Sequence, residues 1–477
     1  MTTTLGNVLA RVAASEVARG DYRVIGSTSV EVTDITHDSR VVRAGSIFCC
    51  VRGDNNDGHD FAVAAVAAGA VVIVVDHEVV GVDATQVVVT DVRRAMGHLA
   101  AAFYEHPSRS LTVVGVTGTN GKTTTAHMLG AILAQAGNHI CVLGTLSGAR
   151  TTPEAPELQR TLASERSKGT TAVVMEVSSH ALALQRVAGM HFAAAVFTNL
   201  GHDHLDFHRT HDAYFAAKAS LFADEYTNLG VVNRDDAYGR KIIDTCGVNT
   251  VSYGHDDATD VAVGASQLQF SWRGARVQCG IGGDFNLSNA LAAATAAVSL
   301  GTSVDDVVSG LAAVGRIAGR FENVNTAGEF AVIVDYAHTP EALRNVLASA
   351  RALVTAKDGR VIVVFGCGGD RDASKRPEMG DAASVADSVI VTSDNPRHES
   401  PSAIIDAIVA GVPATSRAKT VVEVDRRRAI SRAISHARRG DVVVIAGRGH
   451  ETMQSVNGHD LPFDDAVVAR ELLGVRA

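Results

Sequence analysis

The stretch TVVGVTGTNGKTTTAHMLG, residues 112–130, decides the fold of this chain. Its first six residues are mostly apolar and β-branched, which predicts a buried strand, and the residues after Gly121 begin a helix. Between them, Gly118 and Gly121 supply a turn whose backbone N–H groups point inward, at a helix N-terminus that adds positive potential. The stretch therefore predicts a phosphate-binding loop in an α/β sheet.

The loop departs from the strict pattern G-x-x-x-x-G-K-[ST], because Val116 stands where the first glycine is expected. Lys122 would still reach the outer phosphates of a nucleotide, and the Thr123 hydroxyl would meet Mg²⁺. Nucleotide binding is predicted on this basis. A switch, a motor, a kinase and a ligase all remain open as functions.

Length and charge narrow the classes of protein. A chain of 477 residues suggests about three domains, and its 46% hydrophobic content is enough to form sizeable cores. The net charge of −9 argues against nucleic-acid binding, which needs a basic face. An anionic ligand must then be bound by groups within its own site, such as backbone amides or a few Arg and Lys side chains.

The cysteines and the apolar runs indicate a cytoplasmic protein. Six scattered cysteines without a CxxC pair are typical of buried thiols in a reducing compartment, rather than of a disulfide framework or a zinc site. The N-terminus lacks the pattern of a signal peptide, and the longest apolar run is shorter than the ~20 residues that a membrane helix needs. We expect no membrane partner and no nucleic-acid partner, and a monomer.

Short Val/Ile runs alternate with Ala-rich stretches along the whole chain, which predicts an α/β fold of parallel sheets with helices on both faces. Two polar segments, YEHPSRS at 104–110 and NVNTAGE at 323–329, are predicted joints. They divide the chain into predicted domains 1–104, 105–325 and 326–477.

The third predicted domain has the most regular pattern. The strand candidates AVIVD, RVIVVF, SVIVT and DVVVIA each run into a polar loop: YAHTP, GCGGDRD, SDNPR and GRGHE. Ligands of open α/β sheets bind at the carboxyl ends of the strands, so these loops predict a binding site at one edge. The alternative is that they are ordinary solvated turns.

A second polar cluster accompanies the predicted phosphate loop. Glu176 ends the predicted strand in AVVMEVSSHAL. In AVFTNLGHDHLDFH, three histidines and two aspartates follow another predicted strand: His202, Asp203, His204, Asp206 and His208. Zinc is conceivable for the HxH spacing. Mg²⁺ bound mainly by oxygen atoms fits a nucleoside triphosphate site better.

One lysine raises a separate question. In DAYFAAKASLF, residues 212–222, helical spacing places Lys218 on the face of Tyr214, Phe215, Leu221 and Phe222, which should be apolar. A bare ammonium on such a face is costly. The simple alternative is that the lysine stem packs there while the amine reaches water.

The chain resembles the Mur ligases, ATP-dependent amide-forming enzymes of peptidoglycan synthesis, and is most similar to members that add diaminopimelate. The resemblance covers nearly the whole chain in one order of motifs: DSRVVRAGSIF, TGTNGKTTT, TTPEAPELQ, MEVSSHAL, TNLGHDHLDFH, YFAAKASLF, GRFE, VDYAHTP, GCGGDRD, KRPEMG, SDNPRHESP and GRGHE. It implies an N-terminal uridine-nucleotide-binding α/β domain, a central P-loop ATPase-like domain and a C-terminal Rossmann-like domain.

The resemblance implies that ATP converts the D-glutamate side-chain carboxylate of UDP-N-acetylmuramoyl-L-alanyl-D-glutamate into an acyl phosphate, which the amine of meso-diaminopimelate then attacks. It also implies that CO₂ converts Lys218 to a carbamate (N6-carboxylysine) that supplies oxygen ligands to Mg²⁺, which would remove the cost of a buried ammonium beside the metal. The implied catalytic residues are Lys122, Glu176, His204 and Lys218, and the implied metal ligands are Thr123, Glu176, His204 and Lys218.

The resemblance assigns the remaining site residues by position. The implied ATP-binding residues are Gly118, Thr119, Asn120, Gly121, Lys122, Thr123, Thr124, Asn289, Arg320 and Asp335. Those for the UDP-muramoyl dipeptide are Ser39, Asp54, Asn55, Asn56, Thr151, Thr152, Ser178 and Arg186. Those for diaminopimelate are Arg371, Asp394, Asn395, Pro396, Arg397, Gly447 and Glu451.

Some of these assignments have alternatives. Thr151 and Thr152 could cap the helix that follows them, and Asn-Pro in SDNPR could merely set a turn. Arg397 could pair with the distal carboxylate of diaminopimelate, which lysine lacks, so a buried Arg would reject lysine. The competing functions are a lysine-adding or other Mur-type ligase and, in a different class, a nucleotide-dependent binding protein without ligase activity.

Three features depart from the common pattern of the family. Arg448 stands in GRGHE where many members have Lys, and Leu184 stands where some members have a polar substrate contact. The segment GTLSGARTTPEAP is short between its glycine and its threonines. The last two make the muramoyl-peptide assignments weaker than those of the ATP site.

Overall fold

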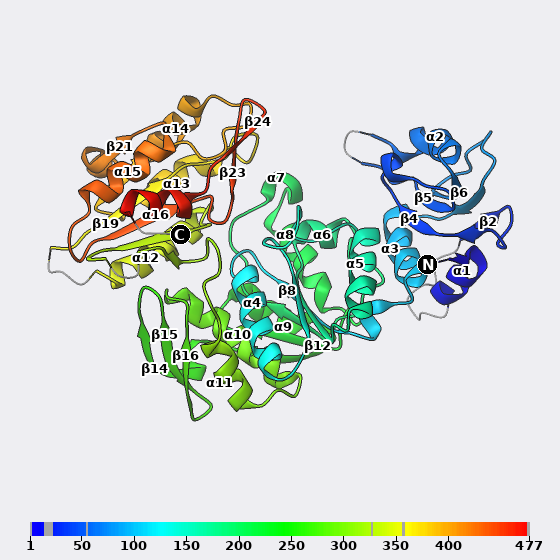
Figure 1. Cartoon of the computed structure of the whole chain (residues 1–477), viewed down its shortest axis with the longest axis horizontal. Coiled ribbons are helices and arrows are strands. Elements are labelled where there is room, and N and C mark those ends of the chain that lie inside the picture. The colour runs from blue at the N-terminus through cyan, green and yellow to red at the C-terminus, as the bar shows by residue number, and fades with distance from the viewer. Residues whose placement is uncertain (1, 14–21, 54–55, 326–327, 355–357, 475–477) are drawn as a thin grey trace.

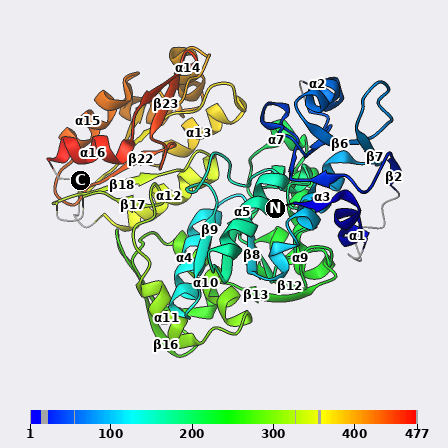
Figure 2. The same cartoon turned by 45° about the vertical axis from the view of Figure 1, so that its right-hand side comes forward.

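The computed structural model describes residues 2–13, 22–53, 56–325, 328–354 and 358–474. Three large sheets of five or six strands follow one another along the chain, and helices cover both faces of each. The N-terminal sheet (blue) and the C-terminal sheet (yellow to red) lie on opposite sides of the central sheet (cyan to green) in Figures 1 and 2. The predicted α/β class with three units is confirmed.

The N-terminal sheet has the order β2-β7-β6-β5-β4, in which only β2 runs antiparallel to its neighbour. Its strands are β2 (Arg23–Ile25), β4 (Asp34–Thr36), β5 (Ser46–Cys49), β6 (Ala70–Val75) and β7 (Thr85–Val88), and β1 (Thr3–Thr4) pairs with β3 (Glu31–Val32) beside them. Helices α1 (Leu5–Ala13) and α3 (Val92–Phe103) cover one face, and α2 (Ala62–Ala67) covers the other.

The central sheet is entirely parallel, with the order β13-β12-β11-β8-β10-β9. Its strands are β8 (Thr112–Thr117), β9 (Ile140–Leu143), β10 (Ala172–Glu176), β11 (Ala194–Phe197), β12 (Leu229–Asn233) and β13 (Asn249–Tyr253). One face packs on α4 (Lys122–Gln135), α10 (Phe285–Ser299), α11 (Val304–Ala312) and the antiparallel strands β14 (Ala258–Val263), β15 (Leu268–Trp272) and β16 (Ala275–Cys279). The other packs on α5 (Ala155–Ser167), α6 (Ser179–Ala183), α8 (His211–Ala219) and α9 (Ala237–Thr245), and α7 (Leu205–His208) precedes α8.

The C-terminal sheet has the order β17-β18-β22-β19-β20-β21, with only β17 antiparallel. Its strands are β17 (Glu322–Asn323), β18 (Ala331–Asp335), β19 (Val361–Phe365), β20 (Ser388–Val391), β21 (Thr420–Val422) and β22 (Val442–Ala446); a hairpin of β23 (Met453–Val456) and β24 (His459–Pro462) follows. Helices α12 (Pro340–Ala352), α13 (Lys375–Ala383) and α14 (Pro401–Ala410) cover one face, and α15 (Arg426–His436) and α16 (Asp465–Leu473) cover the other. The four strands predicted here are confirmed as β18, β19, β20 and β22, and they run parallel.

The remaining predictions concern the two joints between domains, the cysteines and membrane segments. The segment 104–110 contains a short 3₁₀ helix, Pro107–Arg109, in which Pro107 and Ser108 are buried. The other predicted joint includes residues 326–327, which lie outside the described residues. The domain boundaries therefore stay predictions. All six cysteines are free; Cys49, Cys50, Cys279 and Cys367 are buried as predicted, whereas Cys141 and Cys246 are partly exposed. No helix within the described ranges is long and apolar enough to cross a membrane.

Candidate functional site

A cavity of about 500 Å³ lies between the carboxyl edge of the central sheet and the C-terminal part of the chain. The central part contributes the loop after β8, the ends of β10 and β12, and the start of α10. The C-terminal part contributes Asp335, which ends β18, then Tyr336, Ala337 and His338 after it, together with α12. Because both parts line one space, a ligand in it would contact both.

The predicted phosphate loop lines this cavity between β8 and α4. Its shape depends on glycine: a Cβ on Gly118 would lie 1.9 Å from the Thr198 hydroxyl, and a Cβ on Gly121 would lie 2.3 Å from the Asn289 amide oxygen. The Asn199 side chain holds the loop by accepting a hydrogen bond from the Asn120 backbone N–H at 2.9 Å. The loop is therefore fixed before any ligand binds.

A half-buried lysine and a fully buried lysine meet at one backbone carbonyl of the loop. The Lys122 amine donates to the carbonyl oxygens of Gly118 and Thr119, each at 2.8 Å, and the Lys218 amine donates to the Gly118 oxygen at 2.7 Å. Burial lowers the pKa of Lys122, and burial together with the charge of Lys122 lowers the pKa of Lys218 far below its usual range. Two lysine amines therefore converge at a point where negative charge would stabilise their protonated forms.

The α8 helix presents Lys218 as its sequence predicts. Lys218 is only 1% exposed and shares the buried face with Tyr214, Phe215, Leu221 and Phe222. Its amine lies 4.8 Å from the centre of the Tyr214 ring. The alternative of an amine that reaches water is wrong, because the side chain turns inward to the phosphate loop.

Glu176, at the end of β10, organises the oxygen-rich side of the cavity. One carboxylate oxygen accepts hydrogen bonds from the Thr123 hydroxyl at 3.0 Å and from the Thr145 N–H at 2.8 Å. Two ligands at adjacent corners of an octahedral Mg²⁺ site with bonds of about 2.1 Å also lie about 3 Å apart. The Thr123 hydroxyl and the Glu176 carboxylate, both hard oxygen donors, therefore fit Mg²⁺.

The predicted His and Asp cluster does not converge on one point. The His208 ring bonds the Ser179 hydroxyl at 2.9 Å, and the His202 ring packs edge-on against His211. His204 lines the cavity, and burial lowers its pKa to about 3, so that its imidazole is neutral and able to bind a metal. Zinc on the HxH spacing is therefore not supported by this arrangement, whereas His204 alone remains a candidate ligand.

Asp203 joins the two sides of the cavity. Its carboxylate lies 3.7 Å from the ring of His338, which follows β18 of the C-terminal sheet. Burial opposes ionisation of Asp203, but the attraction of His338, His204 and Lys375 outweighs this effect and holds its pKa well below the usual range. The contact of Asp203 with His338 links the loop after β11 to the second sheet across the cavity.

The remaining predicted ATP residues lie in the same cavity. Arg320 donates to the Thr123 hydroxyl at 3.0 Å and stacks over the Tyr336 ring at 4.6 Å. The Asp335 carboxylate accepts from the backbone N–H groups of Phe321 and Ala337, and its burial raises its pKa. All the predicted ATP residues except Gly118 line the cavity: Thr119, Asn120, Gly121, Lys122, Thr123, Thr124, Asn289, Arg320 and Asp335.

The residues predicted for the muramoyl dipeptide fall into two groups. Thr151 and Ser178 line the cavity, and the Thr152 hydroxyl donates to the Glu176 carbonyl at 2.9 Å. The predicted alternative that these threonines cap a helix is wrong, because Glu154 is the N-cap of α5 and makes no side-chain capping bond. Arg186 is bound to Glu154 at 2.9 Å, so this guanidinium has an internal partner.

The uridine-nucleotide residues lie apart from the cavity. Ser39 follows β4 and Asn56 follows β5, and these strands are parallel neighbours, so both residues lie at one edge of the N-terminal sheet. Asp54 and Asn55 lie outside the described residues.

The predicted diaminopimelate residues gather at the carboxyl edge of the C-terminal sheet, outside the lining of the cavity. They follow three adjacent strands: Arg371 after β19, Asp394, Asn395, Pro396 and Arg397 after β20, and Gly447 and Glu451 after β22. The Asn395 amide donates to Glu451 at 2.6 Å, and the Arg397 guanidinium donates to the Gly369 carbonyl at 2.5 Å. Arg371 is exposed and makes no hydrogen bond or ion pair within the described ranges.

Sequence reasoning missed several residues that shape the site. Thr145 holds Glu176, Asn199 holds the phosphate loop, and Tyr336 and His338 face Arg320 and Asp203 across the cavity. Asn199 follows a predicted apolar strand, and Thr145 follows β9, for which no strand was predicted; each lies two residues beyond the strand's end. That position was the available signal, because the carboxyl ends of parallel strands share one edge.

The fold and the cavity define an ATP-dependent ligase that forms amide bonds. Models of known families match three successive regions, described as Mur ligase family, catalytic domain (residues 31–104), Mur ligase middle domain (116–297) and Mur ligase, glutamate ligase domain (319–449).

Relatives and a solved structure agree with these matches. The chain is 44% identical over 471 residues to the UDP-N-acetylmuramoyl-L-alanyl-D-glutamate–2,6-diaminopimelate ligase of Syntrophomonas wolfei, covering 94% of this chain and 96% of the relative. It is 44% identical to the ligase of the same name from Gloeobacter violaceus, covering 94% and 95%. A solved structure with that name superposes with a TM-score of 0.68 at 31% identity, over 99% of both chains. The chain belongs to the Mur ligase family.

Gly121→Ala tests whether the loop shape sets nucleotide affinity. The added Cβ would meet the Asn289 amide at 2.3 Å, so the loop must shift. We expect the Kd for ATP, measured by calorimetry, to rise by ~10-fold or more. The matched control is Gly137→Ala, at a similar positive φ (+86° against +85°) but with nothing within 4 Å. Equal Kd values for the two variants would contradict the steric role of this loop.

Proposed function

We propose that the protein joins meso-diaminopimelate to the D-glutamate side-chain carboxylate of UDP-N-acetylmuramoyl-L-alanyl-D-glutamate, with cleavage of ATP to ADP and phosphate, in peptidoglycan precursor synthesis. The observation that carries the proposal is the cavity shared by the phosphate loop and the C-terminal sheet. It occurs in a chain similar over nearly its full length to ligases named for this reaction. The enzyme would act as a cytoplasmic monomer with domains 1–104, 105–325 and 326–477.

The chemistry follows from the low reactivity of a carboxylate, which an amine does not attack at neutral pH. A carboxylate oxygen of the substrate attacks the γ-phosphorus of ATP, the bond to ADP breaks, and an acyl phosphate forms. The neutral amine of the amino acid then attacks the acyl carbon, phosphate leaves with its bonding electrons, and the amine loses a proton. The protein contributes mainly positioning and neutralisation of negative charge.

The residues of the cavity have separate roles in this proposal. Lys122 and Arg320 neutralise the transferring phosphoryl group, and the loop N–H groups hold the phosphates in line. Thr123, Glu176, His204 and modified Lys218 would hold Mg²⁺, which supplies Lewis-acid stabilisation of the phosphate charges when it is bound. Asn289 and Asp335 contribute the walls of the nucleotide site.

A carbamate on Lys218 suits the surroundings of this side chain. Burial and the charge of Lys122 lower its pKa, which favours the neutral amine, and only the neutral amine can attack CO₂. On attack the nitrogen releases one proton to solvent and keeps one N–H, which can still donate to the Gly118 carbonyl, while the new oxygens are negative. The negative carbamate would then attract Lys122.

Arg397 is the proposed selector of the amino acid. Its backbone has a φ of 52°, and its N–H donates a hydrogen bond to the Ser455 carbonyl at 3.0 Å. One N–H group of its guanidinium donates to the Gly369 carbonyl. Arginine carries five N–H donors, so several remain to pair with a carboxylate. Diaminopimelate has such a carboxylate at its distal end and lysine does not.

Phosphate release across a panel of amino acids tests the function most simply. We expect release that requires both the UDP-muramoyl dipeptide and meso-diaminopimelate, with little release on lysine. Release on lysine alone would make the protein a lysine-adding ligase. No release with any amino acid, despite ATP binding, would place it among nucleotide-dependent binding proteins.

Arg397→Ala should reduce kcat/KM for meso-diaminopimelate by ~100-fold or more, because the distal carboxylate loses its paired donors. Lysine turnover serves as the internal control and should not fall, since lysine makes no such contact. Steady-state phosphate release measures both values. Unchanged constants for diaminopimelate would remove Arg397 from the selector role.

Lys218→Ala should lower ligase turnover by ~100-fold or more, because the anionic oxygens beside Lys122 are lost. A small carboxylate such as acetate should restore part of the activity by filling the gap. The matched control is Lys241→Ala, an exposed lysine of α9 whose amine lies 4.7 Å from the centre of the Phe215 ring. Normal turnover of Lys218→Ala without added carboxylate would exclude the carbamate.

A further inference from the structure

Arg448 is a fully buried cation without a full set of partners. Its side chain is 0% exposed, and one terminal nitrogen donates to the carbonyls of Met453 at 2.7 Å and Phe463 at 2.9 Å. The guanidinium lies 5.2 Å from the centre of the Phe463 ring. Its Nε and other terminal nitrogen have no hydrogen-bond partner in the described part of the chain. A buried guanidinium left half paired is costly, which suggests a role other than stability.

The two carbonyls that Arg448 binds are the two ends of the β23–β24 hairpin. Met453 is the first residue of β23, and Phe463 directly follows Pro462, the last residue of β24. Arg448 itself lies two residues beyond the end of β22. One side chain therefore fixes the base of the hairpin to the central strand region of the C-terminal sheet.

The hairpin in turn holds the segment Asp394–Arg397. The Gln454 amide donates to the Asp394 carbonyl at 2.6 Å, and the Ser455 N–H donates to the Asn395 side chain at 2.9 Å. The Arg397 N–H donates to the Ser455 carbonyl at 3.0 Å, and Arg397 pairs with Val456 as an isolated parallel bridge. The proposed amino-acid subsite is thus built on β23 as an added strand.

Arg448 also affects the charge of the subsite. Its Nε lies 3.7 Å from the Glu451 carboxylate, too far for a hydrogen bond but close enough for strong attraction. Burial and the charge of Asp394 raise the pKa of Glu451, and Arg448, with Asn395 and His338, opposes that rise. Arg426 and Tyr336 are the other titratable groups that interact with Glu451.

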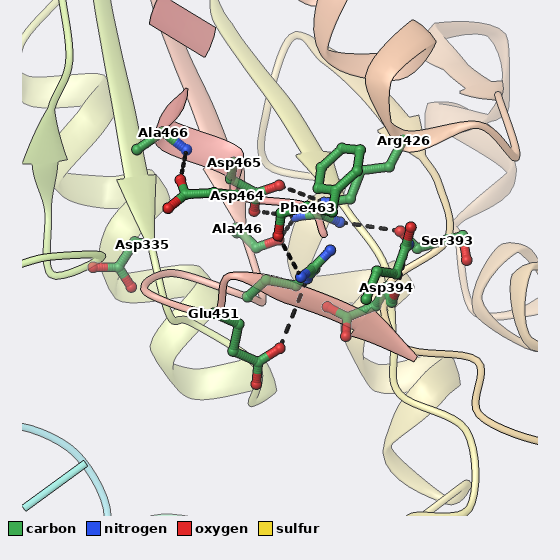
Figure 3. Close-up of polar contacts among 12 residues, drawn as sticks. Asp335, Ser393, Asp394, Arg426, Ala446, Glu451, Phe463, Asp464, Asp465 and Ala466 are labelled. Atoms are coloured by element: carbon green, nitrogen blue, oxygen red, sulfur yellow. Dashed lines mark hydrogen bonds and ion pairs between the residues drawn. The ribbon is translucent and has the colours of Figure 1, made fainter. Parts of the chain in front are cut away.

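A neighbouring buried arginine has a different environment. Arg426 forms two hydrogen bonds of 2.7 Å with the Asp465 carboxylate, and it also binds the carbonyls of Ser393 and Ala446. Figure 3 shows Arg426 and Asp465 in the upper half of the view, with Glu451 in the lower half. Arg426 therefore has a carboxylate partner in hydrogen-bond contact, whereas the carboxylate nearest to Arg448 is that of Glu451, 3.7 Å from its Nε.

We propose that Arg448 is a positioning residue for the incoming amino acid: it fixes both ends of the β23–β24 hairpin that carries Asp394–Arg397, and it keeps Glu451 anionic to receive the substrate ammonium. This inference rests on the proposed function. It predicts an effect on the amino acid and not on ATP, because none of these residues lines the cavity of the phosphate loop.

The test compares Arg448→Met, which removes both the charge and the hydrogen bonds, with Arg448→Lys, which keeps the charge and a donor. We expect Arg448→Met to raise the KM for meso-diaminopimelate by ~10-fold or more, with the KM for ATP within about 2-fold of wild type. Arg448→Lys should recover most of this loss. In Arg448→Met the acidic limb of kcat/KM for diaminopimelate should move up by about one pH unit, because Glu451 loses a nearby cation and must be ionised to bind the ammonium.

The matched control is Arg360→Met, which removes an arginine paired with Asp441 at 2.7 Å at the opposite, amino end of the same sheet. It should leave the KM for diaminopimelate within about 2-fold of wild type. A wild-type enzyme that does not use diaminopimelate would contradict the proposed function itself. If the wild type uses it, an unchanged KM in Arg448→Met, or an equal rise of both KM values, would contradict only the role of Arg448.

Should Arg448→Met fail to fold, Arg448→Gln decides the question, because glutamine keeps donors for the two carbonyls but lacks the charge. The acidic limb of its pH profile should then move upward while that of Arg448→Lys does not. An acidic limb that stays at the wild-type position in Arg448→Gln would overturn the proposal.

Discussion

The structure depends on the Gly118 carbonyl oxygen, which accepts hydrogen bonds from the half-buried Lys122 at 2.8 Å and the buried Lys218 at 2.7 Å. Burial makes each charge costly, and the two charges repel each other, so the pKa of Lys218 lies far below its usual range. Negative charge beside the two amines would offset these costs. The phosphates of ATP would supply part of this negative charge, and a carbamate on Lys218 would supply more of it. We therefore place the modified Lys218 at the centre of the proposed reaction.

The residues around this pair of lysines lie in loops at the carboxyl edges of two sheets. The phosphate loop, Thr145, Glu176 and Asn199 follow four neighbouring strands of the central sheet, so parallel pairing alone gathers them. The C-terminal sheet also gathers polar loops at the carboxyl ends of its parallel strands. The contact of Asp203 with His338 joins the edges of the two sheets. In the proposed function, activation of the carboxylate and selection of the amino acid therefore belong to different sheets.

Local pattern was enough to predict the phosphate loop, the four C-terminal strands and the buried face of α8, because each is set by spacing within about twenty residues. The outcome for Lys218 shows the limit of that reasoning: helical spacing placed it on an apolar face, but only the tertiary fold shows that its amine meets Gly118, 100 positions away. The threonines at 151–152 were open to a capping interpretation for the same reason, since the Glu176 carbonyl that Thr152 binds is distant in sequence. Roles for Thr145, Asn199 and Arg448 needed the contacts themselves, and the assignment of individual substrates to residues rested on family resemblance.

The central claim is that Lys218 serves the reaction as a carbamate beside Lys122. Carbon-13 NMR of the protein in carbon-13-labelled bicarbonate, with ADP and Mg²⁺ present, tests it most directly. The account predicts one slowly exchanging carbamate resonance in the wild-type protein that is absent from Lys218→Ala. A fully active wild-type enzyme with no such resonance at saturating bicarbonate would contradict it.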